Sequence, residues 1–334
     1  MDGFFPTLEA PSFVLPTDTG LDPDDPQSVF DLLALGHADG IAGALLTITG
    51  VIGGAPRSIG AQMAVLADGR FCGYVSGGCV EAAVASEAIA AIEGGRDVTL
   101  RFGEGSPFLD IQLPCGGGID ILVHVRPDPQ MVETARQHIK ARQVFSLAFC
   151  PQQSSAELSP LSPARARSEW RRSRFVRHYH PLTRLVLIGE GPELVALTRL
   201  GKAAGLPVEA FATGDSSAGF SRAAGAEVVS VAGTALPTLP VDPFTAVVFL
   251  LHDRSKETRL LEAALQYEPF YLGALGSRRT HAARLARLAD AGVNQDRLAR
   301  LRGPIGLFGP TRTASALAVS VLGEITDARM RLDG

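Results

Sequence analysis

Residues 184–205 read RLVLIGEGPELVALTRLGKAAG. The run from Arg184 to Ile188 is mostly apolar and has the length of a strand, and it is followed by Gly189-Glu190-Gly191. Helix formers fill Pro192 to Ala204, and Gly205 is a natural stop for the helix. A strand, a glycine turn and a helix in this order open a Rossmann unit. This stretch therefore predicts that the second half of the chain is an α/β domain.

The residues that follow repeat the same alternation. Strand-like runs occur at Val208 to Ala212, Glu227 to Val231 and Ala246 to Leu251, separated by helical or loop segments. A parallel sheet covered by helices requires this order. We therefore expect a Rossmann-like domain with a parallel sheet and C-terminal helices over residues 183–330.

The dinucleotide fingerprint at the first turn is incomplete. Gly189 and Gly191 are followed by Leu194 where a third glycine or alanine usually lets the helix pack closely. The next strand runs into Thr213-Gly214 before it reaches Asp215, so the acid that would bind a ribose hydroxyl is missing or displaced. These two departures argue against NAD(P) as a redox partner.

The first half of the chain has a different pattern. We expect an N-terminal mixed α/β domain over 28–150, an arm over 1–27 that is rich in Pro and Asp, and a linker over 151–182 that is rich in Ser, Pro and Arg. The expected strands are Ala44 to Thr49, Ala61 to Leu66, Phe71 to Val75, Val98 to Phe102 and Ile119 to Val125, with a helix from Val80 to Glu93.

Composition narrows the class of protein. A chain of 334 residues with 46% hydrophobic residues has room for two domains. The net charge of −4 gives no overall attraction for nucleic acid or an anionic membrane. Every apolar run is too short to cross a bilayer, and the first residues lack the basic start and apolar stretch of an export signal. We expect a cytoplasmic protein that binds neither nucleic acid nor membrane.

Residues 53–60 read GGAPRSIG and form the first candidate binding loop. Glycines such as Gly54 expose backbone N–H groups, and Arg57 offers a planar set of donors that suits phosphate. The alternative is a tight turn with a solvent-exposed arginine.

Two cysteines stand in similar surroundings. Cys79 follows Ser76-Gly77-Gly78 and precedes Glu81 at the expected start of a helix, where the helix dipole favours a thiolate that binds metal or carries sulfur. Cys115 precedes Gly116-Gly117-Gly118. The alternatives are small buried residues at crowded turns, and for Glu81 an acid that simply suits the first turn. None of the four cysteines has the spacing of a zinc site.

The second half adds two candidates at expected strand ends. His252-Asp253 follows an apolar strand at the carboxyl edge, where open α/β sheets bind ligands. The pair could serve as an acid/base or as a polar clamp on a ligand, or the histidine could simply be hydrogen-bonded within the fold. In Gly276-Ser277-Arg278 the serine can cap the next helix while its N–H groups and the arginine meet an anion.

Six blocks of the chain resemble, in order and spacing, the signatures of the XdhC/CoxI family. They are 53–84 (GGAPRSIGAQMAVLADGRFCGYVSGGCVEAAV), 114–125 (PCGGGIDILVHV), 187–192 (LIGEGP), 250–254 (LLHDR), 271–285 (YLGALGSRRTHAARL) and 303–325 (GPIGLFGPTRTASALAVSVLGEI). The resemblance covers residues 28–145 and 183–329. One departure is Phe308, which stands where the family usually has an acidic or small residue.

The resemblance implies a cytoplasmic, homodimeric chaperone of molybdenum cofactor, as molybdopterin or its cytidine dinucleotide form. Such a protein supports sulfuration of the cofactor with a cysteine desulfurase and inserts the product into a xanthine dehydrogenase-like apoenzyme. The matching positions are Gly54, Pro56, Arg57, Ser76, Gly77, Gly78, Cys79, Glu81, Cys115, Gly116, Gly117, Gly276, Ser277 and Arg278.

If the chain is such a chaperone, we expect Cys79 to bind molybdenum or relay sulfur, with Cys115 as its partner. We then expect no enzymatic turnover by the protein itself. Gly189, Gly191, His252 and Asp253 are further candidate cofactor contacts. Two alternatives stay open. One is an NAD(P)-dependent oxidoreductase that uses the Rossmann domain, and the other is an interaction scaffold that docks a partner through its basic linker.

Overall fold

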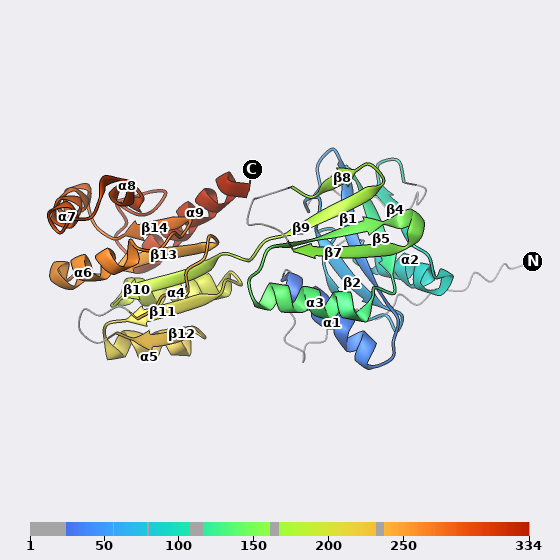
Figure 1. Cartoon of the computed structure of the whole chain (residues 1–334), viewed down its shortest axis with the longest axis horizontal. Coiled ribbons are helices and arrows are strands. Elements are labelled where there is room, and N and C mark those ends of the chain that lie inside the picture. Colours follow the sequence, from blue (N-terminus) through green and yellow to red (C-terminus); the bar gives the residue numbers. More distant parts are fainter. Residues whose placement is uncertain are drawn as a thin grey trace, which may run out of the picture. The chain divides into compact units, whose positions relative to one another are not determined.

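The computed structural model describes residues 25–55, 57–78, 80–106, 116–160, 167–231 and 237–333 (Figure 1). The chain divides into two compact units, Met1–Pro181 and Leu182–Gly334. Each unit has its own sheets and its own apolar core. The predicted arm falls on residues 1–27, of which residues 1–24 lie outside the described residues.

The first unit contains a five-stranded antiparallel sheet in the order β3-β2-β1-β5-β4. Its strands are β1 Gly43–Ile52, β2 Gln62–Leu66, β3 Phe71–Gly73, β4 Val98–Gly103 and β5 Gly118–Val125. Alternate residues point to opposite faces: Leu46 packs on the face covered by helix α2 (Glu81–Gly94), and Leu45 packs on the other. Gly95 ends α2 with a positive φ of 66°, the left-handed conformation that glycine tolerates best.

A second antiparallel sheet and two helices complete the first unit. The sheet has the order β7-β6-β9-β8, from β6 Phe145–Cys150, β7 Ser155–Pro160, β8 Glu169–Arg171 and β9 Arg174–Tyr179. A short 3-10 turn, Pro151–Gln153, precedes β7. Helices α1 (Pro26–Ala38) and α3 (Pro129–Lys140) share a core with this sheet and the second face of the first sheet. In that core the rings of Phe145 and Tyr179 stack at 4.3 Å.

The prediction of a linker over 151–182 is wrong for the described residues of that range. They form β7, β8 and β9, which pair with β6 and bring Phe175 and Tyr179 into the core, so the first unit continues to Pro181 rather than ending at residue 150. The composition is misleading because the exposed face of these strands carries the Ser, Glu and Arg residues, while a few aromatic side chains fill the buried face.

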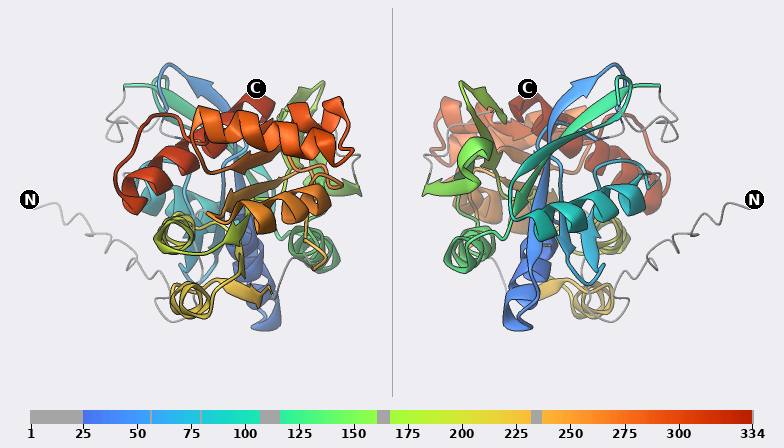
Figure 2. Two further views of the ribbon diagram at one scale, coloured as in Figure 1. Left: turned by 90° about the vertical axis from the view of Figure 1, so that its left-hand side faces the viewer. Right: turned by 90° about the vertical axis from the view of Figure 1, so that its right-hand side faces the viewer.

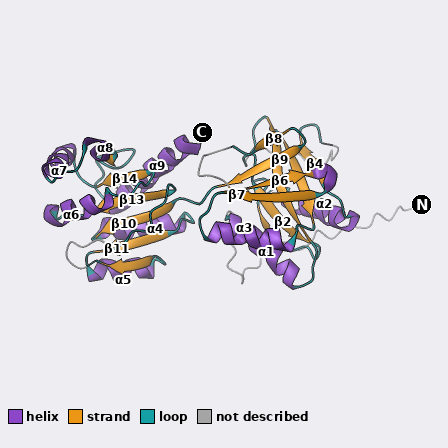
Figure 3. Ribbon diagram, viewed as in Figure 1, coloured by secondary structure: helices purple, strands orange, loops and turns teal. Residues whose placement is uncertain are grey.

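The second unit contains a six-stranded parallel sheet in the order β12-β11-β10-β13-β14-β15. Its strands β11, β10, β13 and β14 are labelled in Figure 3. The strands are β10 Arg184–Gly189, β11 Val208–Ala212, β12 Glu227–Ser230, β13 Thr245–Leu250, β14 Tyr271–Ala274 and β15 Leu301–Arg302. The predicted Rossmann-like domain with a parallel sheet is therefore confirmed, as is the mixed α/β class of the first unit.

Helices cover both faces of this sheet (Figure 2). One face packs on α4 (Pro192–Ala203), α5 (Asp215–Ala223) and α9 (Ala314–Asp333), and the other on α6 (Arg254–Ala264), α7 (Arg278–Asp290) and α8 (Gln295–Ala299). The chain runs from β10 outward to β12 and then returns to β13 on the other side of β10. The order therefore switches between β10 and β13, which is where open α/β sheets bind ligands.

Across the described part of the chain, no helix has both the length and the apolar character needed to cross a membrane.

Candidate functional site

Three glycine-containing loops leave one end of the first sheet. Because neighbouring strands are antiparallel, β1, β3 and β4 end there, and β2 and β5 begin there. The connecting segments are 53–61, 74–80 and 104–117, which hold the three glycine clusters expected from the sequence. We call their described residues the loop end. Pro56, Cys79 and Cys115 fall within these segments but lie outside the described residues.

Two of the loops are in direct backbone contact. A Cβ atom added to Gly117 would lie 2.2 Å from the carbonyl oxygen of Gly54, so only glycine fits at Gly117. Gly53 and Gly116 have positive φ angles of 64° and 71°. An added Cβ at Gly54 or Gly116 would meet no atom of the described residues within 4 Å. The two turns therefore pack against each other through Gly117 and Gly54. No described residue covers the open side of Gly54 or of Gly116.

A buried carboxylate holds the third loop. Glu81, 1% exposed, accepts hydrogen bonds from Ser76 N (2.7 Å) and Ser76 Oγ (2.7 and 2.8 Å to its two oxygens), and from Val80 N (3.2 Å). Ser76 Oγ in turn accepts from Gly78 N at 3.2 Å. Gly77 and Gly78 are exposed at the tip. Glu81 and Ser76 thus fix the shape of this loop from beneath, while the glycines face outward.

The described charges near the loop end are of both signs. Arg57 is half-buried in the first loop. Arg101 lies two residues before the end of β4 and donates to Asp120 at 2.7 and 2.8 Å, and these bonds raise the pKa of Arg101.

The described residues contain no group of three or more His, Cys, Asp or Glu side chains that could hold a metal ion. Cys72 and Cys150 are both buried.

The second unit has a polar pocket at the switch point between β10 and β13. Its volume is about 400 Å³. We call it the switch-point pocket, and its lining residues come from α4, the ends of β13 and β14, α6, α7, the segment before α9 and the first turn of α9: Glu193, Leu251, His252, Glu257, Leu275, Gly276, Thr280, Arg284, Thr311, Arg312, Thr313, Ala314 and Leu317. It therefore occupies the place where this fold binds ligands.

A buried ion pair forms the floor of the switch-point pocket. Arg284, 1% exposed, donates to Glu257 at 2.7 Å and to the carbonyl oxygen of Leu275. Glu257 is 2% exposed. Burial and then the charge of Arg284 lower the pKa of the neighbouring His281. Because an unpaired buried charge is costly, the pair fixes the relative positions of α6, α7 and the turn after β14.

The glycine turn of the Rossmann unit is not built to hold a pyrophosphate. The N–H of Gly191, which would face phosphate in a dinucleotide site, donates to Ser217 Oγ at 2.8 Å. Two carboxylates flank the turn: Glu190 accepts from Thr213 Oγ1 at 3.2 Å, and Glu193 lies 3.6 Å from His252 Nε2. Their negative charge would repel phosphate. The sequence argument against NAD(P) thus gains a structural reason.

The residues predicted in the second unit fall in different places. His252 and Gly276 line the switch-point pocket. Ser277 caps α7 by accepting from Thr280 N at 3.1 Å, and Asp253 accepts from Lys256 N at 3.2 Å. The other predicted residues do not reach the pocket. Gly189 lies against β13, where an added Cβ would be 2.2 Å from Leu250 O, and Arg278 is exposed in the first turn of α7.

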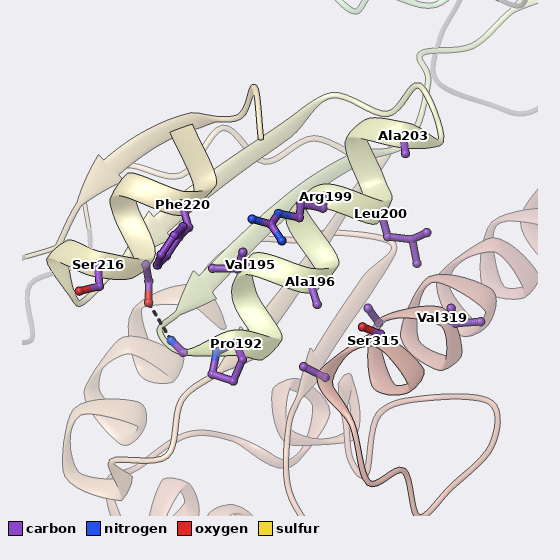
Figure 4. A pocket seen from close by; sticks show the side chains of 14 residues that line it. Pro192, Val195, Ala196, Arg199, Leu200, Ala203, Ser216, Phe220, Ser315 and Val319 are labelled. Carbon is purple, nitrogen blue, oxygen red and sulfur yellow. Dashed lines mark hydrogen bonds between the residues drawn. The ribbon is translucent and has the colours of Figure 1, made fainter. Parts of the chain in front are cut away.

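A second cavity lies between α4, α5 and α9 (Figure 4). It has a volume of about 840 Å³ and is lined mainly by small and apolar side chains, with Arg199 and Phe220 at its edges. Gly191 opens onto this cavity rather than onto the switch-point pocket. Sequence reasoning did not predict this cavity, because its walls come from three separate helices.

Comparison with known proteins assigns both halves of the chain to one family. Residues 37–103 match the sequence profile of the XdhC and CoxI family, and residues 185–325 match that of the XdhC Rossmann domain. The molybdenum cofactor insertion chaperone PaoD of Escherichia coli (strain K12) is 37% identical over 307 residues, which are 92% of this chain and 90% of PaoD. The chain belongs to the XdhC and CoxI family.

Two further relatives are more distant. The uncharacterized protein YqeB of Escherichia coli (strain K12) is 29% identical over 102 residues, 30% of this chain and 18% of that protein. A crystal structure described as a xanthine dehydrogenase from Bacillus halodurans shares the fold, with a TM-score of 0.71 and 21% identity, over 90% of this chain and 96% of that one. The resemblance to the family that the sequence blocks indicated is therefore confirmed.

The family blocks map onto both sites. Blocks 53–84 and 114–125 contain the loop end, and blocks 250–254 and 271–285 contribute His252, Gly276 and Arg284 to the switch-point pocket. Sequence reasoning missed Glu190, Glu193 and Arg284. The two glutamates could have been noticed as acids beside a turn that usually faces phosphate. Arg284 gave no signal, because a helical arginine is usually exposed.

Proposed function

We propose that this protein is an accessory protein that binds molybdenum cofactor, supports its sulfuration and inserts it into a xanthine dehydrogenase-family apoenzyme. The observation that carries the proposal is the 37% identity with a molybdenum cofactor insertion chaperone across 92% of the chain. A relationship over nearly the whole length includes the loop end as well as the Rossmann unit. The protein then acts as a carrier and needs no turnover of its own.

The loop end has the features that such a cofactor requires. A pterin phosphate needs N–H donors and a cation, which Gly54, Gly78, Gly116 and Arg57 offer on exposed or half-buried turns. In the described part of the loops, no atom lies within 4 Å of a Cβ added at any of these three glycines, which would let a bulky ligand approach the backbone. When bound, the cofactor supplies the molybdenum centre that the target enzyme uses. Ser76 and Glu81 position the third loop.

Several finer points belong to the proposal. Cys79, close to the start of α2, would bind molybdenum or carry sulfur, with Cys115 beside it, and a cysteine desulfurase would supply the sulfur. The cofactor would be molybdopterin or its cytidine dinucleotide form. The protein would act in the cytoplasm as a homodimer. An NAD(P)-dependent oxidoreductase remains the rival function, and the carboxylates at the Rossmann turn weigh against it.

The test is to express the full chain in cells that make molybdenum cofactor and to measure bound molybdenum and pterin. Wild-type protein should hold both in near-equal amounts, and Cys79→Ala and Arg57→Ala should lose most of them. Cys150→Ala is the matched control, since that thiol is buried at the end of β6. Wild-type protein that lacks pterin but binds NAD(P) would replace this proposal with the oxidoreductase.

A further inference from the structure

Arg177 of β9 packs against the first loop of the loop end. A Cβ atom added to Gly60, near the end of that loop, would lie 2.9 Å from Arg177 Cδ, 3.0 Å from Arg177 Nε and 3.1 Å from Ser168 Oγ. Gly60 has a positive φ of 90°, which favours glycine, and its N–H donates to the carbonyl oxygen of Ile48 at 2.8 Å. The end of the loop is therefore held between β1 and the side chain of Arg177.

No carboxylate of a described residue pairs with Arg177. Its Nη1 donates to the carbonyl oxygen of His178, and the centre of the Tyr179 ring lies 4.6 Å from its Cζ. Its Nε is buried and has no hydrogen-bond partner in the described part of the chain. Burial lowers the pKa of Arg177, against a smaller raising effect of Tyr179. The described surroundings of this cation therefore offer no carboxylate to balance its charge.

Other arginines of the chain have the partner that Arg177 lacks. Arg101, Arg136 and Arg284 each lie within 2.7 Å of a carboxylate oxygen. A cation that is withdrawn from water without such a partner costs free energy, and an apolar side chain of similar size is often as stable or more stable in its place. Residues that break a rule of this kind are expected at functional sites. The charge of Arg177 is therefore a candidate for a role in binding.

The first loop is the segment on which that charge acts. It runs over residues 53–61, with the exposed Gly54 near its start and the half-buried Arg57 in its middle, which are the groups proposed above to hold a phosphate. Arg177 approaches the same segment from the side of β9, through Gly60. A cation behind a turn of the backbone adds to the positive field of the N–H groups, and its effect is stronger where water is partly excluded.

We propose that Arg177 is a positioning residue for anion binding at the first loop. It holds the end of the loop through Gly60, and its charge is balanced by a phosphate group bound on the loop. That this phosphate belongs to molybdenum cofactor rests on the proposed function. Arg177 lies outside every block that resembles the family, in the range expected to be a linker, so the resemblance did not point to it.

The test uses the full chain purified from cells that cannot make molybdenum cofactor, with inorganic phosphate as the probe. Isothermal titration at an ionic strength fixed with sodium chloride should show saturable binding to wild type, and Arg57→Ala should weaken it if the phosphate lies on the first loop. Arg177→Met and Arg177→Gln should each weaken binding on the order of tenfold, the effect of one charge several ångströms away in a partly buried site. Arg177→Lys keeps the charge and should retain most of the affinity.

An arginine with a merely structural role would give a different result. Arg174→Met on the same strand is the matched control, because Arg174 is exposed and pairs with Glu157, and it should bind phosphate as wild type does. Without phosphate, Arg177→Met should unfold at a urea concentration no lower than wild type, since an unbalanced charge has been removed. The proposal is overturned if wild type binds no phosphate, if the folded neutral variants bind it as wild type does, or if neither neutral variant folds.

These outcomes are separate from those of the proposed function. Pterin and molybdenum are measured in protein from cells that make the cofactor, and their absence from wild type would overturn the proposed function while leaving a dependence of phosphate binding on Arg177 intact. Equal amounts of bound cofactor in wild type and Arg177→Met would instead keep the proposed function and overturn the role of Arg177.

Discussion

At the scale of single residues, Glu81 supports the third loop of the loop end. Its carboxylate accepts from Ser76 N, Ser76 Oγ and Val80 N while it is 1% exposed. Removing it would leave those donors buried without an acceptor, at about 1–3 kcal/mol each. We predict that Glu81→Ala lowers the free energy of unfolding by about 3 kcal/mol in urea denaturation.

Glu93→Ala on the same helix is the control for Glu81. Glu93 is exposed in the last turn of α2, where a negative charge faces the negative end of the helix dipole. Its removal should leave stability unchanged within about 0.5 kcal/mol. An equal change in the free energy of unfolding for the two variants would mean that the buried hydrogen bonds of Glu81 do not stabilise the protein.

His178 on β9 predicts a dependence of stability on pH. It is 3% exposed, and neither ring nitrogen has a partner among the described residues. Burial, followed by the charges of Arg171 and Arg177, lowers its pKa below the usual 6.5, against a smaller raising effect of Glu169. The unfolded chain therefore takes up a proton at this residue before the folded chain does, so stability is lost as pH falls below about 6.5.

We predict that His178→Leu removes part of this loss. Urea denaturation at pH 7.5 and pH 5.5 should give a smaller difference in the free energy of unfolding for the variant than for wild type. His281, whose pKa is also lowered, accounts for part of what remains. If the variant shows the full wild-type difference, then His178 does not titrate with folding.

Local chemistry could be predicted from sequence at this scale, and burial could not. The Ser277 cap needs only the residues next to it, and it was predicted. The burial of Glu81 depends on a turn that folds back over five residues, and the Glu257 contact of Arg284 joins two helices. Such contacts depend on tertiary packing, which single-residue preferences do not contain.

At the scale of elements, Gly189 decides how closely β10 approaches β13. An added Cβ would lie 2.2 Å from the carbonyl oxygen of Leu250, which is backbone and cannot rotate away. We predict that Gly189→Ala destabilises the second unit by about 3 kcal/mol, because the two strands must separate. Thermal unfolding followed by circular dichroism would measure the change.

Gly219→Ala in α5 is the matched substitution for Gly189. No atom of a described residue lies within 4 Å of the Cβ that it would add. Alanine favours the helix over glycine by up to about 1 kcal/mol, so this variant should be slightly more stable than wild type. A destabilised Gly219→Ala protein would show that the effect at Gly189 does not come from the close contact between strands.

Elements with strong periodicity could be predicted, and those without it could not. The strand at Val208 to Ala212 and the helix before Gly95 were expected at nearly their observed bounds, because each has a clear apolar run and a stop signal. In β7 only alternate side chains are even partly buried, and no residue of β8 is buried. Their partners in β6 and β9, rather than their own composition, make them strands.

At the scale of the whole molecule, the boundary between the units lies at Pro181. We predict that fragments 1–181 and 182–334, expressed separately, each unfold cooperatively in urea, because each keeps its own core. A fragment 1–150 should not fold, because β6 loses both neighbours and the core loses Phe175 and Tyr179. Cooperative unfolding of the 1–150 fragment in urea would instead support the predicted linker over 151–182.

The short outer strand β8 has a further consequence. It spans only Glu169–Arg171 at one edge of the second sheet, and exposed arginines lie in it and just beyond it, at Arg171, Arg172 and Arg174. An edge strand with free N–H and C=O groups invites another chain to add to it, and short length and positive charge discourage that addition. We therefore expect this short strand and its arginines, which suggested a docking segment, to discourage edge-to-edge association of copies of the protein.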